Sequence, residues 1–214
     1  ISEDSKKKLM TIFKIPSDRI EVNHLGVDAH PEVSTSKGDY ILFSAQAFPR
    51  RHLKETLLAF EKIAPHFPDL KFKVVAIDKY TPLVIGPLIR EINTRLGSER
   101  IQYQERVSGE VLVDLMAHAK ALTYISTEEA FGLPPVEALA FGTMPVVADN
   151  GLTREDNAFF VKNPDSVDEI AQALRAALTD THNQSQITAA APEMVNRLSW
   201  KAHADRFLNL VRNV

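Results

Sequence analysis

The chain has 214 residues, of which 44% are apolar, and a formal net charge of -3 at pH 7, which suits one large domain or two small ones with enough apolar material for a core. The mild acidity argues against non-specific nucleic-acid binding, and the absence of cysteine excludes disulfides and thiolate metal sites and favours a reducing, cytosolic compartment. No apolar run approaches the roughly 20 residues that span a bilayer. Because the first residue is Ile1 rather than methionine, we expect a fragment of a longer protein.

The predicted elements begin with a charged helix over residues 2–14, which stops before Pro16. Short runs rich in β-branched and aromatic residues follow, and we predict strands at residues 40–45, 72–77, 122–126, 145–149 and 158–161. These runs are apolar throughout rather than alternating, which is typical of strands buried on both faces of a parallel sheet. Asp78 follows the second run, so it is expected near the ligand-binding edge of the sheet.

Apolar residues at helical spacing lie between these runs, at residues 53–64, 111–119 and 167–178. The alternation predicts right-handed βαβ units and an α/β fold, a Rossmann-like doubly wound parallel sheet. Beyond residue 179 only loop and helix are expected, ending in a helix capped by Ser199 with an apolar stripe from Trp200 to Val211. We therefore predict one domain over residues 1–214: a helical lead (1–16), an α/β core (about 19–180) and C-terminal helices (about 181–214). The polar stretch 30–39 is the best candidate for a hinge or surface loop.

The stretch "STEEAFGLPPVEALAFGTMPVVADN" at residues 126–150 places three glutamates around one turn. Open parallel sheets bind ligands at the carboxyl ends of their strands, against the start of the next helix. Gly132 allows close backbone approach, and Pro134 suits a first helical position, so we predict a helix over 134–141 whose free N–H groups, with those of Gly132 and Leu133, bind an anion. Glutamates at such a place also simply complement the helix dipole. Both interpretations stay open for Glu137, whereas Glu128 is expected at the solvated surface.

The same stretch closely resembles the signature of group 1, or family 4, retaining glycosyltransferases of GT-B fold, in which two glutamates enclose seven residues, here Glu129 and Glu137. Other segments resemble the family in order and spacing: "HLGVD" (24–28), "AFPRRHLKETLLAFEKI" (47–63), "VSGEVLVDLMAHAKALTYIS" (107–126) and "RLSW" (197–200). The resemblance covers nearly the whole chain.

The resemblance implies a nucleotide-sugar site that needs no metal and no other cofactor. It implies that Glu129 is the catalytic residue facing the donor sugar, that Glu137 holds the ribose hydroxyls, and that the backbone of Phe131, Gly132 and Leu133 contacts sugar and phosphate. The family's arginine and lysine for the donor diphosphate fall on Gln46 and Arg51. Arg51 can serve there, but Gln46 lacks the charge; Arg50 is either its replacement or simply a surface residue. Ala130 stands where a glycine is common, and segment 150–156 is shorter than the family norm.

The chain is accordingly expected to be the donor-binding C-terminal domain of an enzyme that transfers a hexosyl unit to a glycan, lipid or small-molecule acceptor. Its N-terminal acceptor-binding domain is absent from this sequence, so the chain alone is an incomplete catalytic unit. A cytoplasmic location is expected, with attachment of the full-length protein to the inner face of the membrane left open; neither nucleic acid nor a transmembrane segment is expected. Two alternatives remain: a catalytically degenerate nucleotide-sugar sensor or scaffold, suggested by Gln46, and a GT-B-fold sugar-nucleotide epimerase. The base, the sugar, the acceptor, the linkage and the oligomeric state stay open.

Overall fold

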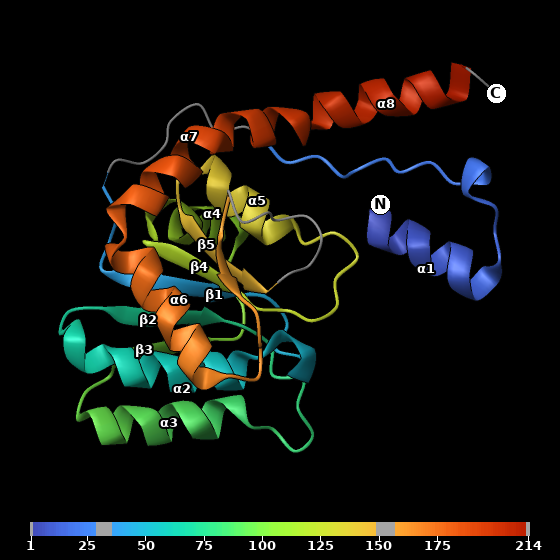
Figure 1. Cartoon of the computed structure of the whole chain (residues 1–214). Coiled ribbons are helices and arrows are strands. Elements are labelled where there is room, and N and C mark those ends of the chain that lie inside the picture. The colour runs from blue at the N-terminus through green and yellow to red at the C-terminus, as the bar shows by residue number, and fades with distance from the viewer. Residues whose placement is uncertain (1, 29–35, 149–156, 213–214) are drawn as a thin grey trace.

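The computed structural model describes residues 2–28, 36–148 and 157–212. At its centre lies a six-stranded sheet whose neighbouring strands are all parallel, in the spatial order β3-β2-β1-β4-β5-β6 (Figure 1). The strands are β1 (Tyr40–Ser44), β2 (Lys71–Val75), β3 (Ile101–Gln104), β4 (Ala121–Tyr124), β5 (Met144–Ala148) and β6 (Phe159–Val161). The predicted fold class is confirmed, and each of the five predicted strands lies within about two residues of its expected bounds.

The helices are α1 (Glu3–Phe13), α2 (Leu53–Ile63), α3 (Ile85–Leu96), α4 (Gly109–His118), α5 (Leu133–Ala140), α6 (Val167–Thr179), α7 (Thr181–Arg197) and α8 (Trp200–Arg212). Helix α2 packs against both α3 and α6, while α5 packs on β4, β5 and α7 (Figure 1). The chain winds from β1 outward to β3, returns to β4 beside β1, and winds outward again to β6. Its winding direction therefore reverses between β1 and β4, which is where a doubly wound sheet offers its ligand crevice.

One strand and one helix had no clear signal in the sequence. Strand β3 is a four-residue edge strand with two glutamines, only its first residue, Ile101, is buried, and so it lacks the apolar run of the central strands. Helix α3 buries Ile85, Ile89 and Ile92, although Gly86 and Pro87 at its start obscure the pattern. Pro87 is tolerated because it lies in the first helical turn, where its missing N–H has no intrahelical partner.

The apolar face predicted for residues 111–119 is only partly correct. Met116 and Ala119 are buried with Leu42 and Leu122, because α4 covers the sheet near β1 and β4. Val111 is exposed and borders a small hollow with Val75 of β2 and Gln104 of β3, so this end of α4 does not close over the sheet.

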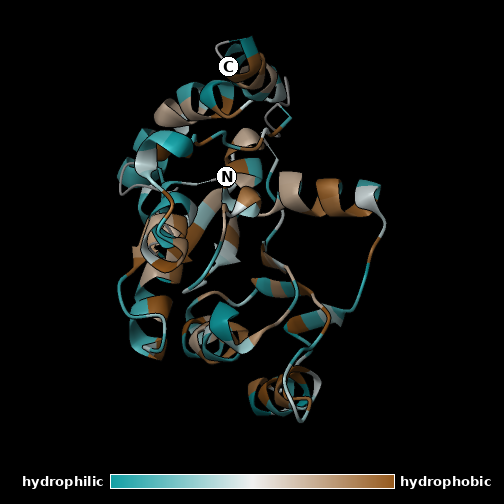
Figure 2. Cartoon of the chain, turned by 90° about the vertical axis from the view of Figure 1, so that its right-hand side faces the viewer, coloured by the Kyte–Doolittle hydropathy of each residue, from teal (hydrophilic) through white to brown (hydrophobic). Residues whose placement is uncertain are grey.

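The two terminal helices form as predicted but leave their apolar residues uncovered. Ser2 Oγ accepts a hydrogen bond from the Ser5 amide at the start of α1, and Ser199 Oγ accepts one from the Ala202 amide at the start of α8. Phe13 on α1 is 67% exposed and Phe207 on α8 is 55% exposed. Both helices extend to the right of the sheet in Figure 1, and Figure 2, viewed from that side, shows both hydrophobic and hydrophilic residues on the helix next to the C-terminus. The described residues contain no helix with the length and apolar character needed to cross a membrane.

Residues 23–28, called the strap below, fasten the N-terminal segment to the junction of α7 and α8. The Val27 amide donates to the Leu198 carbonyl at 2.7 Å, and His203 Nδ1 lies 2.7 Å from the His24 carbonyl oxygen. The backbones approach so closely that a Cβ atom on Gly26 would lie 2.5 Å from Trp200 Cα. Most of the predicted hinge or surface loop at 30–39, and the short segment 150–156, lie outside the described residues.

Candidate functional site

Two loops meet where the winding direction of the sheet reverses. One follows β1 and includes the short 3-10 turn Pro49–Arg51, and the other follows β4 and leads into α5. The Thr127 amide and hydroxyl both reach the Arg50 carbonyl oxygen, at 3.1 and 3.3 Å, and Arg50 Nε lies 3.4 Å from the Glu128 carbonyl oxygen. The topology thus brings the predicted segments 46–51 and 126–133, far apart in sequence, to one edge of the sheet.

An ion pair joins two of the predicted site residues across these loops. Arg51 Nε lies 2.9 Å from Glu129 Oε1, and the two side chains are only 15% and 12% exposed. Ser126 Oγ donates to the same carboxylate oxygen at 3.1 Å. Arg51 also donates to the Gln46 carbonyl oxygen at 3.3 Å, so the loop that carries Gln46 orients the guanidinium.

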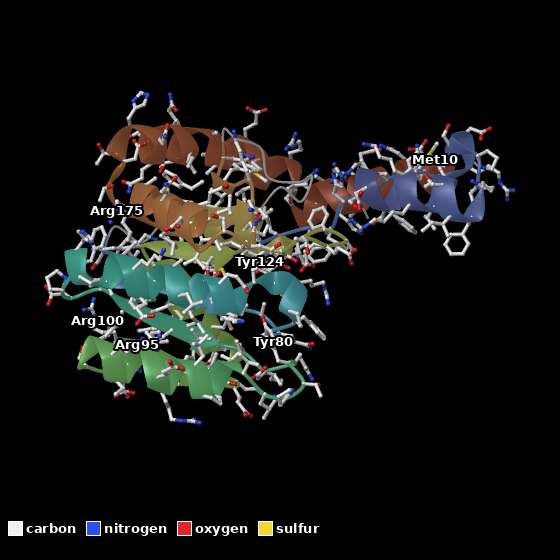
Figure 3. The ribbon with its side chains drawn as sticks, turned by 60° about the horizontal axis from the view of Figure 1, so that its bottom comes forward. Met10, Tyr80, Arg95, Arg100, Tyr124 and Arg175 are labelled. Carbon is white, nitrogen blue, oxygen red and sulfur yellow. The ribbon has the colours of Figure 1, made fainter. Side chains whose placement is uncertain are left out.

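Tyr124 forms the floor beneath this pair. It ends β4, at the centre of the molecule in Figure 3, and the Arg51 guanidinium lies 5.5 Å from the centre of its ring. Burial raises the pKa of Tyr124 well above its ordinary value, which keeps the phenol neutral beside the Glu129 carboxylate. Ser126 and Tyr124 were not among the predicted site residues, because their roles depend on which loop lies opposite.

The turn before α5 differs in detail from the prediction. The helix starts at Leu133 rather than Pro134, and Gly132 precedes it with φ 81° and ψ 60°. Glycine adopts this left-handed conformation without the steric cost of a side chain. Pro134 and Pro135 then occupy the second and third helical positions, where they supply no N–H groups. The predicted anion site therefore rests mainly on the amides of Gly132 and Leu133 and has fewer donors than expected.

The side chain of Phe131 is buried, and its ring lies 5.5 Å from that of His24 in the strap. Leu133 is partly buried against the main core. Both side chains therefore hold the turn in place, which leaves the backbone of residues 131–133 as the part that can contact a ligand. Burial lowers the pKa of His24, so its ring is neutral against Phe131 at neutral pH.

Glu137 lies on α5, one turn beyond the start of the helix. Its carboxylate is half-buried, and it has no hydrogen-bond or ion-pair partner in the described part of the chain. Burial raises its pKa, and the nearby carboxylate of Asp28 at the end of the strap raises it further. A partly desolvated carboxylate without a partner is costly to the fold, which is typical of a group that binds a ligand. Glu128, as predicted, is exposed.

Asp78 has a structural role, and the described residues contain no cluster of metal-binding side chains. Asp78 does lie beside Ala47 at the carboxyl edge, but its carboxylate accepts hydrogen bonds from the amides of Tyr80, Val84 and Ile85 and so caps α3. Within residues 2–28, 36–148 and 157–212, no group of three or more His, Asp or Glu side chains is arranged to hold a metal ion.

Comparison with known proteins connects this site to a family. Residues 28–194 match the family model for glycosyl transferases group 1. The chain is 25% identical over 227 residues to O-antigen chain mannosyltransferase B of Escherichia coli, an alignment that covers 98% of this chain and 58% of the relative. A glycosyltransferase structure from Rickettsia africae superposes on the whole chain with a TM-score of 0.82 at 20% identity, over 62% of its own length. A TarM structure from S. aureus in complex with UDP gives a TM-score of 0.79 at 15% identity, over 98% of this chain and 42% of that one.

The structural neighbours are GT-B glycosyltransferases, whose fold this six-stranded unit shares. The chain spans little more than half the length of its E. coli relative. The family match covers more than three quarters of the chain and includes the β1–α2 and β4–α5 loops that join at Arg51 and Glu129. This chain belongs to the group 1 family of glycosyl transferases.

Proposed function

We propose that this chain is the donor-binding domain of a retaining glycosyltransferase and that it holds a nucleotide-sugar between the Arg51–Glu129 pair and α5. The observation that carries the proposal is the placing of a partly buried basic side chain, two carboxylates and a glycine turn at the point where the sheet reverses its winding. Phosphate needs the cation and the amides, whereas sugar hydroxyls need carboxylate acceptors.

Cleavage of the bond between sugar and diphosphate leaves negative charge on the departing phosphate. Arg51 and the amides of Gly132 and Leu133 would stabilise this charge without a metal ion. Glu129 would then accept hydrogen bonds from the sugar, and Glu137 from the ribose. Arg51 is paired with Glu129 in this structure, so donor binding would require an exchange of partners: the guanidinium would turn to the diphosphate and the carboxylate to the sugar.

The acceptor, whether glycan, lipid or small molecule, would bind to a second domain. The chain covers 58% of its E. coli relative and 62% of the Rickettsia structure, and α1 and α8 present uncovered apolar residues such as Phe13 and Phe207. Met10 on α1 lies well clear of the sheet in Figure 3. An apolar surface of this kind suits an interface with another domain. We place the reaction in the cytoplasm, in line with the absence of cysteine.

The proposal is tested by titrating the chain with UDP, GDP and ADP sugars while following its NMR spectrum, with a mannosyl donor first because the E. coli relative is a mannosyltransferase. We expect binding in the millimolar range, which requires only about 4 kcal/mol, with shifts at the amides of Gly132 and Leu133 and at Arg51 Nε. No transfer is expected from this chain alone. If none of the donors shifts these signals, the proposal is wrong.

A degenerate sensor or scaffold is the second candidate, because Gln46 is exposed and brings no positive charge to the site. Arg50 is also exposed and lies over the Phe48 ring at 4.5 Å, where it can reach the same loop as Arg51. Donor binding without turnover in the full-length protein would favour the scaffold. The family match favours a transferase over the epimerase alternative.

Glu137 gives a prediction that depends on pH. Its folded-state pKa is raised above the ordinary value near 4.5, so the folded state binds this proton more tightly than the unfolded state does. The free energy of unfolding should therefore fall as pH rises from about 4.5 through the raised value. We expect Glu137→Gln to be as stable as the native chain at pH 4 and more stable at pH 7, in urea unfolding, while it binds nucleotide-sugar more weakly. A native chain that matches the variant in stability at pH 7 would contradict this.

A further inference from the structure

His52 combines three unfavourable features at one position beside Arg51. It precedes α2 with φ 45° and ψ 33°, a left-handed conformation that costs a residue with a side chain about 1–2 kcal/mol. Its side chain is only 9% exposed. In the described part of the chain its Nε2 is buried without a hydrogen-bond partner. A glycine there would avoid all three, so the ring must make a contact that offsets them.

The contact lies at Nδ1. This atom is 3.3 Å from Asp165 Oδ1, in the loop between β6 and α6, and 3.9 Å from Glu55 Oε2 on α2 itself. Ionised carboxylates only accept hydrogen bonds, so a ring proton on Nδ1 is the one that would face Asp165. In that tautomer Nε2 is the acceptor.

The backbone of His52 is fixed on both sides of the ring. Its amide donates to the Pro49 carbonyl, and its carbonyl oxygen accepts from the amide and the hydroxyl of Thr56, at 2.9 and 2.7 Å. These bonds make the 3-10 turn and the first turn of α2 one rigid unit. Because α2 and α6 pack side by side, the contact of Nδ1 with the Asp165 carboxylate, whose side chain is 84% exposed, links this unit to the residues just before α6.

We propose, resting on the donor-site function above, that His52 is a positioning residue that fixes the β1–α2 loop through Asp165, so that Arg51 stays within reach of Glu129 and of a bound diphosphate. Arg51 is the preceding residue, and its guanidinium already depends on this loop through the Gln46 carbonyl oxygen. Without the ring, the loop loses its tie to the β6–α6 loop and Arg51 loses its fixed direction.

Three variants of the chain separate this role from a merely structural one. His52→Gly removes the ring and also the backbone strain, so its urea midpoint should equal or exceed that of the native chain, while its affinity for GDP or UDP should fall about tenfold. His52→Asn tolerates the left-handed conformation and offers an amide donor to Asp165, so it should restore most of the affinity. Asp165→Ala should reproduce the loss of affinity. In the native chain, ¹⁵N spectra of the ring should show the Nδ1–H tautomer.

Several outcomes would overturn the proposal. One is a His52→Gly variant that binds as tightly as the native chain, and another is an Nε2–H tautomer for His52. If the native chain binds neither GDP nor UDP, the donor-site function is wrong. The positioning role of His52 is then tested separately by the NMR signal of Arg51 Nε–H. In that case a signal that shifts or broadens in His52→Gly supports the positioning role, and an unchanged signal refutes it.

Discussion

Replacing Arg51 with alanine is expected to weaken nucleoside diphosphate binding by about thirtyfold, the change that about 2 kcal/mol produces for a lost charge-assisted hydrogen bond. The guanidinium is 15% exposed and paired with Glu129, so it acts from a partly dehydrated position where its charge is poorly screened. The same change in the full-length enzyme should reduce turnover further, because charge on the leaving diphosphate grows in the transition state. Isothermal titration with GDP and UDP measures the first effect.

Two comparison variants make the Arg51 result specific. Arg95 lies on α3, paired with Glu61 and Glu91 and away from Tyr124 (Figure 3), so Arg95→Ala should leave the affinity unchanged. Glu129→Ala removes the partner that competes for Arg51, so it should bind the bare diphosphate as tightly as the native chain or more tightly, while it abolishes transfer by the full-length protein. Equal affinity of the native chain and Arg51→Ala would show that the guanidinium does not contact phosphate.

Replacing Gly26 with alanine is expected to lower the free energy of unfolding by about 3 kcal/mol, at the upper end of what overpacking costs. The added methyl group would lie 2.5 Å from Trp200 Cα and 2.6 Å from its amide nitrogen, and backbone atoms cannot rotate away as a side chain can. The strap must then lift from α8, which breaks the hydrogen bond from the Val27 amide to Leu198. Urea unfolding measures the loss.

Gly109 provides the matched control for this change. It starts α4 directly after the Ser108 cap, and a Cβ atom there would meet nothing within 4 Å. Gly109→Ala should therefore be neutral or stabilise the chain by up to about 1 kcal/mol, because alanine favours the helix. If the two variants unfold at the same urea concentration, the close approach at Trp200 does not limit stability.

The strands with the clearest signal in the sequence are those with two buried faces. Strands β4 and β5 are buried at every position, so their apolar runs carry a strong signal, whereas β3 at the edge exposes Gln104 and carries almost none. The face of α4 was partly misjudged at Val111 because spacing shows which residues share a face but not how far the neighbouring sheet extends beneath it.

For the candidate site as well, the sequence predicts the positions of residues along the chain better than the contacts between them. Strand and helix alternation places Arg51 and Glu129 on loops at one edge of the sheet, but their ion pair depends on the tertiary fold. Pro134 and Pro135 limit the free amides at the start of α5 wherever that helix begins, because neither residue carries an N–H group. The left-handed backbone of His52 was not predicted, because histidine, although enriched in that conformation relative to most residues, adopts other conformations far more often.

The strap links a helix that reaches away from the sheet to the turn that would hold the donor. The His24 ring contacts Phe131 immediately before Gly132, while the His24 carbonyl oxygen contacts His203 on α8. Any reorientation of α8 therefore changes the support beneath the 131–133 backbone. Thermodynamic linkage makes this influence reciprocal: a donor that favours one arrangement of the turn favours the matching orientation of α8 by the same free energy. On the proposed function, this short segment would couple the occupancy of the donor site to the orientation of α8.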